Sequence, residues 1–160
     1  MVNSDIYNLF KELINLPVEN ECVEFKEAKN DFSFEDLGKY FSALSNEANL
    51  KNKRYAWIIF GVKDKGKPRD IVGTNYKNNA ERLQALKKDI AMHTSNNITF
   101  IEIHELEIEN KRIIMFQIPP SPQSVPMAWK GHYYGRDGES LGALNIQELE
   151  FIRNQNMVTD

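Results

Sequence analysis

The sequence has little cysteine or histidine and no long apolar run, and each shortage excludes a class of protein. Cys22 is the only cysteine, so the chain cannot form an internal disulfide. The three histidines, His93, His104 and His132, are too scattered for a zinc-binding motif. No apolar run approaches the ~20 residues of a membrane span. The first residues also lack the basic start and the cleavage site of a signal peptide. We therefore expect a cytoplasmic protein with no membrane partner.

The sequence also lacks a large excess of charge of either sign. Its 20 lysine and arginine residues oppose 23 aspartate and glutamate residues, which gives a formal net charge of -3. The molecule as a whole therefore does not attract polyanions, and a polyanionic partner must be held by a local patch. Basic clusters that could form such a patch occur at 51–54, 63–69 and 87–88, although charge runs of this kind are also typical of solvated loops.

What the chain does contain is enough apolar material for one core. It has 160 residues, of which 41% are hydrophobic. This size suits a single domain over residues 1–160, and the sequence shows neither an internal repeat nor a domain boundary. The domain could be the N-terminal part of a longer regulator.

The pattern of apolar residues predicts helices and strands in mixed order. Helical spacing and capping residues predict four helices, at 3–15, at 33–48, from the Asn78–Glu81 capping box to the stop at 96–97, and at 146–153. Alternating or continuous apolar runs predict strands at 22–28, 55–62 and around 70–73, and hairpins within 98–118 and 128–138. Because strands and helices do not alternate strictly, we expect an α+β fold: a mixed β-sheet with β-hairpins and about four helices packed on it.

The segment ECVEFKEAKND, residues 21–31, combines many charges with apolar residues. On a regular strand Val23 and Phe25 point to one face, and Glu24 and Lys26 point to the other. Metal-dependent nucleases use a Glu-x-Lys spacing on a strand, in which the acid holds a divalent cation and the lysine orients water or neutralises phosphate. A salt bridge on a half-exposed strand explains the same pattern equally simply.

Two further carboxylates strengthen the metal hypothesis. Glu19 precedes Glu24 by five residues, and Asp64 follows the predicted central strand, at the kind of strand end where ligands bind in α/β sheets. If the three acids converge, their oxygens would suit Mg²⁺ or Mn²⁺.

Residues 61–67 match G-x-x-x-x-G-K after an apolar strand, as in a nucleotide-binding P-loop. The next residue is Pro68, where a P-loop needs Ser or Thr, and the following segment has strand rather than helix character. We therefore interpret this segment as a lysine-rich β-turn.

The hairpin AWKGHYYGRDG interleaves aromatic and basic side chains: Trp129, Tyr133 and Tyr134 with Lys130, His132 and Arg136. Such a mixture can stack on bases and bind a nucleic-acid backbone. Alternating aromatic residues on a hairpin can equally fill a core.

Several of these motifs, taken in order, resemble the schlafen-type, AlbA-like domain family. The motifs are E-x4-E-F-K at 19–26, FSALSN at 41–46, IFGVKD at 59–64, IVG at 71–73 and YGRDG at 134–138. The family is described as a DNA-binding domain of bacterial proteins labelled transcriptional regulators or divergent ATP-binding proteins. In some animal schlafens it resembles an RNA-cleaving core.

The resemblance implies a metal site made of Glu19, Glu24 and Asp64. If the third position shifted by one residue it would fall on Lys65, and the triad would be incomplete. The chain also departs from the family at the usual Asn-x-x-Gly-Gly, because the segment after Asn46 has no glycine pair and forms a longer, more basic loop.

From these observations we expect a nucleic-acid-binding domain, for DNA or RNA, of a bacterial transcriptional regulator. The expected phosphate contacts are Lys26, Lys51, Lys53, Arg54 and Arg136. Binding would need no cofactor. The alternative is a Mg²⁺- or Mn²⁺-dependent nuclease in which Glu19, Glu24 and Asp64 hold the metal and Lys26 offsets developing charge. A sensor or oligomerisation module is a third hypothesis, and the resemblance also implies a homodimer.

Overall fold

The computed structural model describes residues 3–16, 22–137 and 140–155. Its helices are α1 (Asn3–Leu13), α2 (Phe34–Leu50), α3 (Ala80–Ala91), the short 3₁₀ helix η1 (Ser95–Asn97) and α4 (Ile146–Arg153). Its strands are β1 (Val23–Lys26), β2 (Ala56–Phe60), β3 (Val62–Gly66), β4 (Arg69–Ile71), β5 (Glu102–Ile108), β6 (Lys111–Ile118), β7 (Ala128–Trp129), β8 (His132–Asp137) and β9 (Ser140–Ala143). The expected α+β fold class is confirmed.

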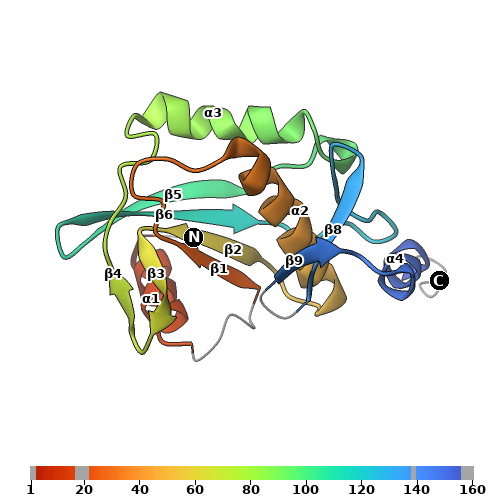
Figure 1. Ribbon diagram of the computed structural model, residues 1–160, viewed down its shortest axis with the longest axis horizontal. Helices are drawn as coiled ribbons and strands as arrows, with labels where there is room; N and C mark the ends of the chain where they lie inside the picture. The colour runs from red at the N-terminus through yellow and green to blue at the C-terminus, as the bar shows by residue number, and fades with distance from the viewer. Residues whose placement is uncertain (1–2, 17–21, 138–139, 156–160) are drawn as a thin grey trace.

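A mixed four-stranded sheet forms the centre of the molecule (Figure 1). Its strand order is β1-β2-β6-β5, in which β1 and β2 are parallel and the other pairs are antiparallel. All five residues of β2 are buried, which confirms the segment as a central strand. Strands β3 and β4 form a separate hairpin, and β7, β8 and β9 form a small third sheet.

Helices cover both faces of the central sheet. On one face α1 packs Ile6, Phe10 and Leu13 against alternate residues of β1, β2 and β6. On the other face α2 and α3 pack against the remaining alternate residues of the central strands, such as Ile58 and Phe116. Figure 1 shows α3 and α1 on opposite sides of the sheet. This three-layer arrangement follows from the two-residue alternation of strands.

The predicted strand 55–62 is divided at Gly61. This residue has a φ of +98°, and an added Cβ would lie 2.9 Å from Ile113 Cδ1 and 3.0 Å from the Arg112 carbonyl oxygen. Glycine alone fits this backbone without strain. The chain therefore leaves the central sheet after Phe60 and enters the β3–β4 hairpin, which contains Asp64.

The β3–β4 hairpin differs from the interpretation of residues 61–67 as a lysine-rich turn, because most of this segment is strand β3 and the turn lies at residues 67–68. These residues form β3 and the turn into β4, without the helix whose N-terminus holds phosphate in a P-loop.

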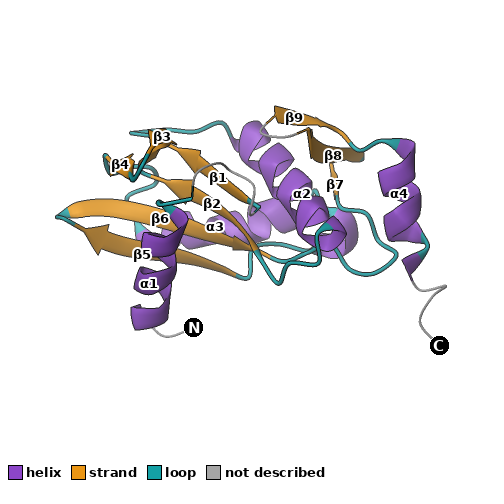
Figure 2. Cartoon of the chain, turned by 90° about the horizontal axis from the view of Figure 1, so that it is seen from below, coloured by secondary structure: helices purple, strands orange, loops and turns teal. Residues whose placement is uncertain are grey.

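Helix α2 joins the central sheet to the small third sheet (Figure 2). Asn46 is fully buried; its Nδ2 donates to the carbonyl oxygens of Met127 and Tyr134 at 2.9 and 2.8 Å, and its Oδ1 accepts from Met127 N at 2.7 Å. At the other end of the helix the Trp129 ring lies directly against Gly38. The position of β8 therefore depends on α2.

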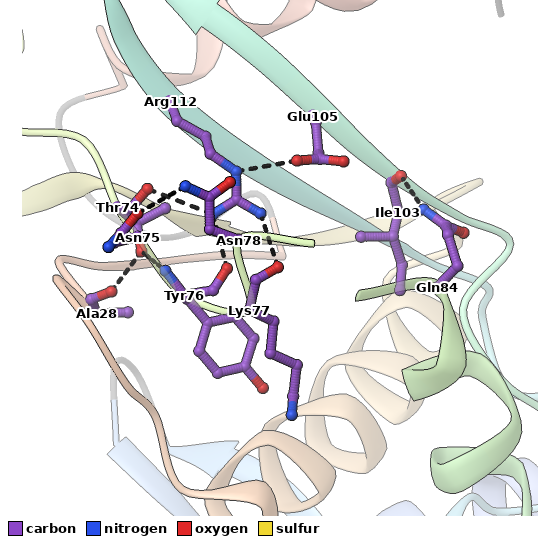
Figure 3. A network of polar contacts seen from close by, with 10 residues as sticks. All are labelled: Ala28, Thr74, Asn75, Tyr76, Lys77, Asn78, Gln84, Ile103, Glu105 and Arg112. Atoms are coloured by element: carbon purple, nitrogen blue, oxygen red, sulfur yellow. Dashed lines mark hydrogen bonds and ion pairs between the residues drawn. The ribbon is translucent and has the colours of Figure 1, made fainter. Parts of the chain in front are cut away.

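Arg112 holds the loop that precedes α3 (Figure 3). Its guanidinium donates to the carbonyl oxygens of Thr74, Tyr76 and Lys77 at 3.3, 2.6 and 3.2 Å, and to Glu105 Oε2 at 2.9 Å. One side chain thus fixes the backbone of residues 74–77 next to β5.

Side chains also bond to the outer edge of β5. Gln84 Nε2 donates to the Ile103 carbonyl oxygen at 3.1 Å (Figure 3). The Tyr7 hydroxyl donates to the Glu107 carbonyl oxygen at 3.5 Å and accepts from Glu107 N at 3.2 Å. These bonds occupy backbone groups that an edge strand would otherwise expose.

The remaining local predictions differ from the structure in three places. Helix α3 ends at Ala91 rather than at the predicted stop at 96–97, which lies in the short helix η1. Helix α3 begins behind Asn79, whose side chain accepts from Arg82 N at 3.1 Å, so the predicted Asn78–Glu81 box is one residue early. Strand β9 was missed because SLGA carries no clear alternation. The Asn145–Glu148 capping box of α4 and the β5–β6 hairpin are confirmed. Among the described residues, no helix has the length and apolarity to cross a membrane.

Candidate nucleic-acid interface

Strand β1 is more deeply buried than its sequence indicates. Val23 and Phe25 lie in the core on the α1 side, as predicted. Glu24, on the opposite face, is only 3% exposed, so the expectation of a half-exposed face with an open carboxylate is wrong at this residue. The face is closed because α2 and β8 pack over it, a tertiary contact that the local alternation does not predict.

Two cations neutralise the Glu24 carboxylate. Arg136 Nη2 lies 2.9 Å from Oε1, and Lys26 Nζ lies 3.4 Å from Oε2. The Arg136 side chain is 2% exposed and also donates to the Val23 carbonyl oxygen at 3.3 Å. The Arg136 Nη2 contact lacks the angle of a hydrogen bond, and Nε and Nη2 have no hydrogen-bond partner among the described residues. The pair is therefore a close ionic contact rather than a bidentate one.

Burial and charge act in opposite directions at this pair. Burial raises the pKa of Glu24 above its usual value, although Arg136 and Lys26 favour its ionised form. Burial acts to lower the pKa of Lys26, but its contacts with Tyr40 and Glu24 outweigh this, and the pKa is raised. Lys26 therefore remains a cation beside the buried acid.

Two lysine–tyrosine pairs lie next to this ion pair. Lys26 Nζ is 4.9 Å from the centre of the Tyr40 ring, and Lys39 Nζ is 5.9 Å from the centre of the Tyr134 ring. Tyr134 and Arg136 are two residues apart on β8 and so project to the same face. We call Lys26, Lys39, Tyr40 and Tyr134 the β1–α2 surface. All four are partly exposed.

Sequence reasoning missed Lys39 and Tyr40. Both lie in the middle of a helix whose apolar spacing draws attention only to its buried face. Tyr134 stood in a motif, but its pairing with Lys39 depends on how β8 docks on α2. No sequence signal in a single chain could have found this pairing.

The basic loop after α2 extends the positive charge along the same helix. Lys51, Lys53 and Arg54 are exposed, as predicted. Lys51 pairs with Glu47 at 2.8 Å, and Arg54 lies 5.7 Å from the centre of the Tyr55 ring.

The pKa of Cys22 is affected both by the basic loop and by Arg136. Burial and the charge of Glu47 raise its pKa to about 11, while Lys51, Arg136 and Lys53 act to lower it. The basic loop and Arg136 are therefore both within electrostatic reach of the start of β1. At neutral pH the Cys22 thiol is protonated and unreactive.

The predicted three-acid site is only partly described. Glu19 lies outside the described residues. Asp64 is exposed on β3, and its charge contributes to the raised pKa of Glu24. Within 3–16, 22–137 and 140–155, no three His, Cys, Asp or Glu side chains gather as metal ligands.

The described residues do not fit a metal ion at Glu24 in this arrangement, because each of its oxygens already faces a cation. A divalent ion would have to displace Arg136 or Lys26. The three-acid metal site therefore stays a prediction.

Solved structures similar to this chain include the following two. One is the DIP2311 protein of Corynebacterium diphtheriae, with a TM-score of 0.62 and 14% identity over 95% of this chain and 29% of that protein. The other is the N-terminal domain of a protein of Nitrosomonas europaea named as related to the ATP-dependent DNA helicase RecG. It has a TM-score of 0.58 and 16% identity, over 86% of this chain and 89% of that one. At these identities the likeness shows the fold.

Comparison with curated protein sequences found no significant match. This chain spans 29% of the length of the Corynebacterium protein. The family described as Schlafen, AlbA_2 matches residues 19–145, which include β1, α2, β8 and the whole β1–α2 surface. The chain therefore belongs to the Schlafen, AlbA_2 family.

Proposed function

We propose that this domain binds the backbone of DNA or RNA through the β1–α2 surface and the basic loop after α2. The observation that carries the proposal is the pair of lysines, Lys26 and Lys39, each lying over a tyrosine ring beside a neutralised Glu24. Lysines attract phosphates, and tyrosine rings offer faces on which bases can stack.

The basic loop would lengthen this contact. Lys39 lies on α2 and Lys51, twelve residues later, is the C-cap of this helix, which corresponds to a separation of roughly 18 Å along the helix. Lys53 and Arg54 follow directly. Arg136 is buried, so we assign it a supporting role, in which it cancels the charge of Glu24 that would otherwise repel phosphate. The name of the Nitrosomonas protein, which refers to a DNA helicase, supports this nucleic-acid role.

Within this proposal the domain is the nucleic-acid-binding part of a bacterial transcriptional regulator, as the family resemblance implies. A homodimer with two such domains around one nucleic acid is part of the same proposal, and light scattering on the protein alone and with bound oligonucleotide would test it.

Metal-dependent cleavage is the second candidate. The effect of Asp64 on the pKa of Glu24 favours it, because two of the three predicted acids are then within electrostatic reach, with Lys26 beside them. Both oxygens of Glu24 face cations, however, so we place binding first.

Fluorescence anisotropy with labelled single-stranded and duplex DNA and RNA tests both candidates. We expect binding at low salt that weakens as salt rises, with a log–log slope of roughly 0.7–0.9 per phosphate neutralised. Lys39→Gln and Lys53→Gln should each lower this slope by roughly 0.7–0.9, the value for one phosphate contact. Lys88→Gln, which changes an exposed lysine on α3, should leave the slope unchanged. Absence of binding to every oligonucleotide at low salt would refute the proposal.

The same samples report on cleavage when they are incubated with Mn²⁺ or with a chelator and resolved by gel. A nuclease should cut only with metal, and Asp64→Asn should abolish the cutting while binding persists. Intact oligonucleotide under all conditions would leave binding as the function and remove the second candidate.

A further inference from the structure

A cavity of about 650 Å³ lies between the loop after β1, the loop before α3, and the C-terminal half of α3. Its volume is in the range of small-molecule sites. None of its lining residues belongs to the β1–α2 surface or to the Glu24 ion pair. The proposed nucleic-acid function therefore does not account for it.

Aromatic side chains held by the core form part of the cavity wall. Phe32 packs 4.9 Å from the centre of the Phe60 ring, and Phe34 packs edge-on 5.4 Å from the centre of the Trp129 ring. Because their partners are fully or nearly fully buried, these rings are fixed in place. Aromatic walls of this kind attract flat apolar groups and cations.

Tyr76 is an almost fully buried polar residue of the cavity wall. Tyr76 is 2% exposed, and its backbone is fully engaged: N donates to Thr74 Oγ1 at 3.0 Å, and O accepts from Arg112 at 2.6 Å. Figure 3 shows its ring pointing away from this polar network. In the part of the chain that the structure describes, nothing hydrogen-bonds the hydroxyl, although the residue lines the cavity. A ligand in the cavity could satisfy it.

Carboxylates predominate among the charged groups of the cavity. Asp31 and Asp89 line it, against the single ammonium of Lys77, which lies 5.7 Å from the centre of the Tyr76 ring. Asp89 is in the last turn of α3, where the helix dipole disfavours a negative charge, and no described cation pairs with it. Within the described ranges, Asp31, Asp89 and His93 do not gather as ligands of one metal ion. A cation that is larger than a bare metal ion therefore suits these carboxylates better.

From this geometry we propose that the cavity binds a small organic cation, an amidinium, guanidinium or ammonium group on a flat apolar body. Asp31 and Asp89 would hold the charged end. The apolar body would lie against Phe32 and Phe34, and a polar atom of the ligand would hydrogen-bond the Tyr76 hydroxyl.

Amide NMR with benzamidine as the probe tests this site on the full chain. Benzamidine should shift the signals of residues 31–34, 76–77 and 86–93. Its neutral isostere benzamide should bind about two- to fivefold more weakly, because it lacks the charge that would pair with the exposed carboxylates of Asp31 and Asp89. Equal binding of benzamide, or shifts confined to other residues, would overturn the proposal.

Matched variants locate the charge and the hydroxyl. Asp89→Asn, at an exposed carboxylate, should weaken benzamidine binding about two- to fivefold, and Tyr76→Phe about two- to tenfold. Glu81→Gln makes the same charge change at the other end of α3, outside the cavity, and should have no effect. If Glu81→Gln weakened binding as much as Asp89→Asn, general electrostatics rather than this cavity would explain the effect, and the site would be rejected.

Discussion

Glu24 and Arg136 show how much a single buried ion pair determines in this molecule. Their side chains are 4% and 2% exposed. Removal of Arg136 therefore leaves the buried Glu24 carboxylate with the more distant Lys26 as its remaining described cation. Loss of one partner of a buried ion pair costs about 3–5 kcal/mol. We therefore expect Arg136→Gln to lower the free energy of unfolding by this amount at neutral pH, as measured by denaturant titration. Lys51→Gln, which breaks the more exposed pair with Glu47, should cost less than about 1 kcal/mol.

The pH dependence of this loss has a definite sign. Because the folded-state pKa of Glu24 is raised, its contribution to stability is greatest below its ordinary value of 4.5 and is lost as the pH rises through the folded pKa. Without Arg136 the folded pKa should rise further. The destabilisation by Arg136→Gln should therefore shrink when unfolding is measured near pH 4, and a constant difference at both pH values would contradict this role of Glu24.

The docking of α2 on the third sheet depends on the absence of a side chain at Gly38. An added Cβ would lie 2.1 Å from Trp129 Cε2. Alanine is the better helix former by about 1 kcal/mol, yet overpacking of this kind costs roughly 1–3 kcal/mol or more. We expect Gly38→Ala to lower the melting temperature. Gly142→Ala, which has nothing within 4 Å, should leave it nearly unchanged.

At the scale of helices and strands, the sequence predicted the elements themselves more accurately than the contacts between them. Apolar spacing in α2 and the continuous run in β2 identified both elements, because each buries side chains in a regular pattern. The burial of Glu24 and the pairing of Lys39 with Tyr134 depend on residues about a hundred positions apart in the chain. Local periodicity carries no information on such contacts, so the acid was expected on an open face.

The whole molecule extends beyond the residues that match its family. Helix α1 precedes the matched range 19–145, yet Ile6, Phe10, Leu13 and Ile14 are buried against the sheet. Their burial is worth on the order of 6–12 kcal/mol at ~1.5–3 kcal/mol each. Since this equals most of the stability of a typical domain, a chain that begins at residue 17 should not fold cooperatively.

Thermal unfolding and dye binding to exposed apolar surface would check this expectation. Removal of residues 146–160 is a comparison of similar size. Within its described part, α4 buries only Ile152 fully, so this truncation should leave a cooperative transition at a lower temperature. A cooperative thermal unfolding transition of the chain that lacks α1 would contradict this expectation, because it would show that the sheet folds without α1 on that face.

The side chains that bond to β5 affect the behaviour of the protein at high concentration. Tyr7 and Gln84 occupy backbone positions along the outer edge of this strand, and they come from two helices on opposite faces of the sheet. A strand from another molecule would have to break these bonds before it could extend the sheet. Intermolecular β-polymerisation through β5 therefore has a barrier built into the native state, and replacement of these two residues should promote fibril formation.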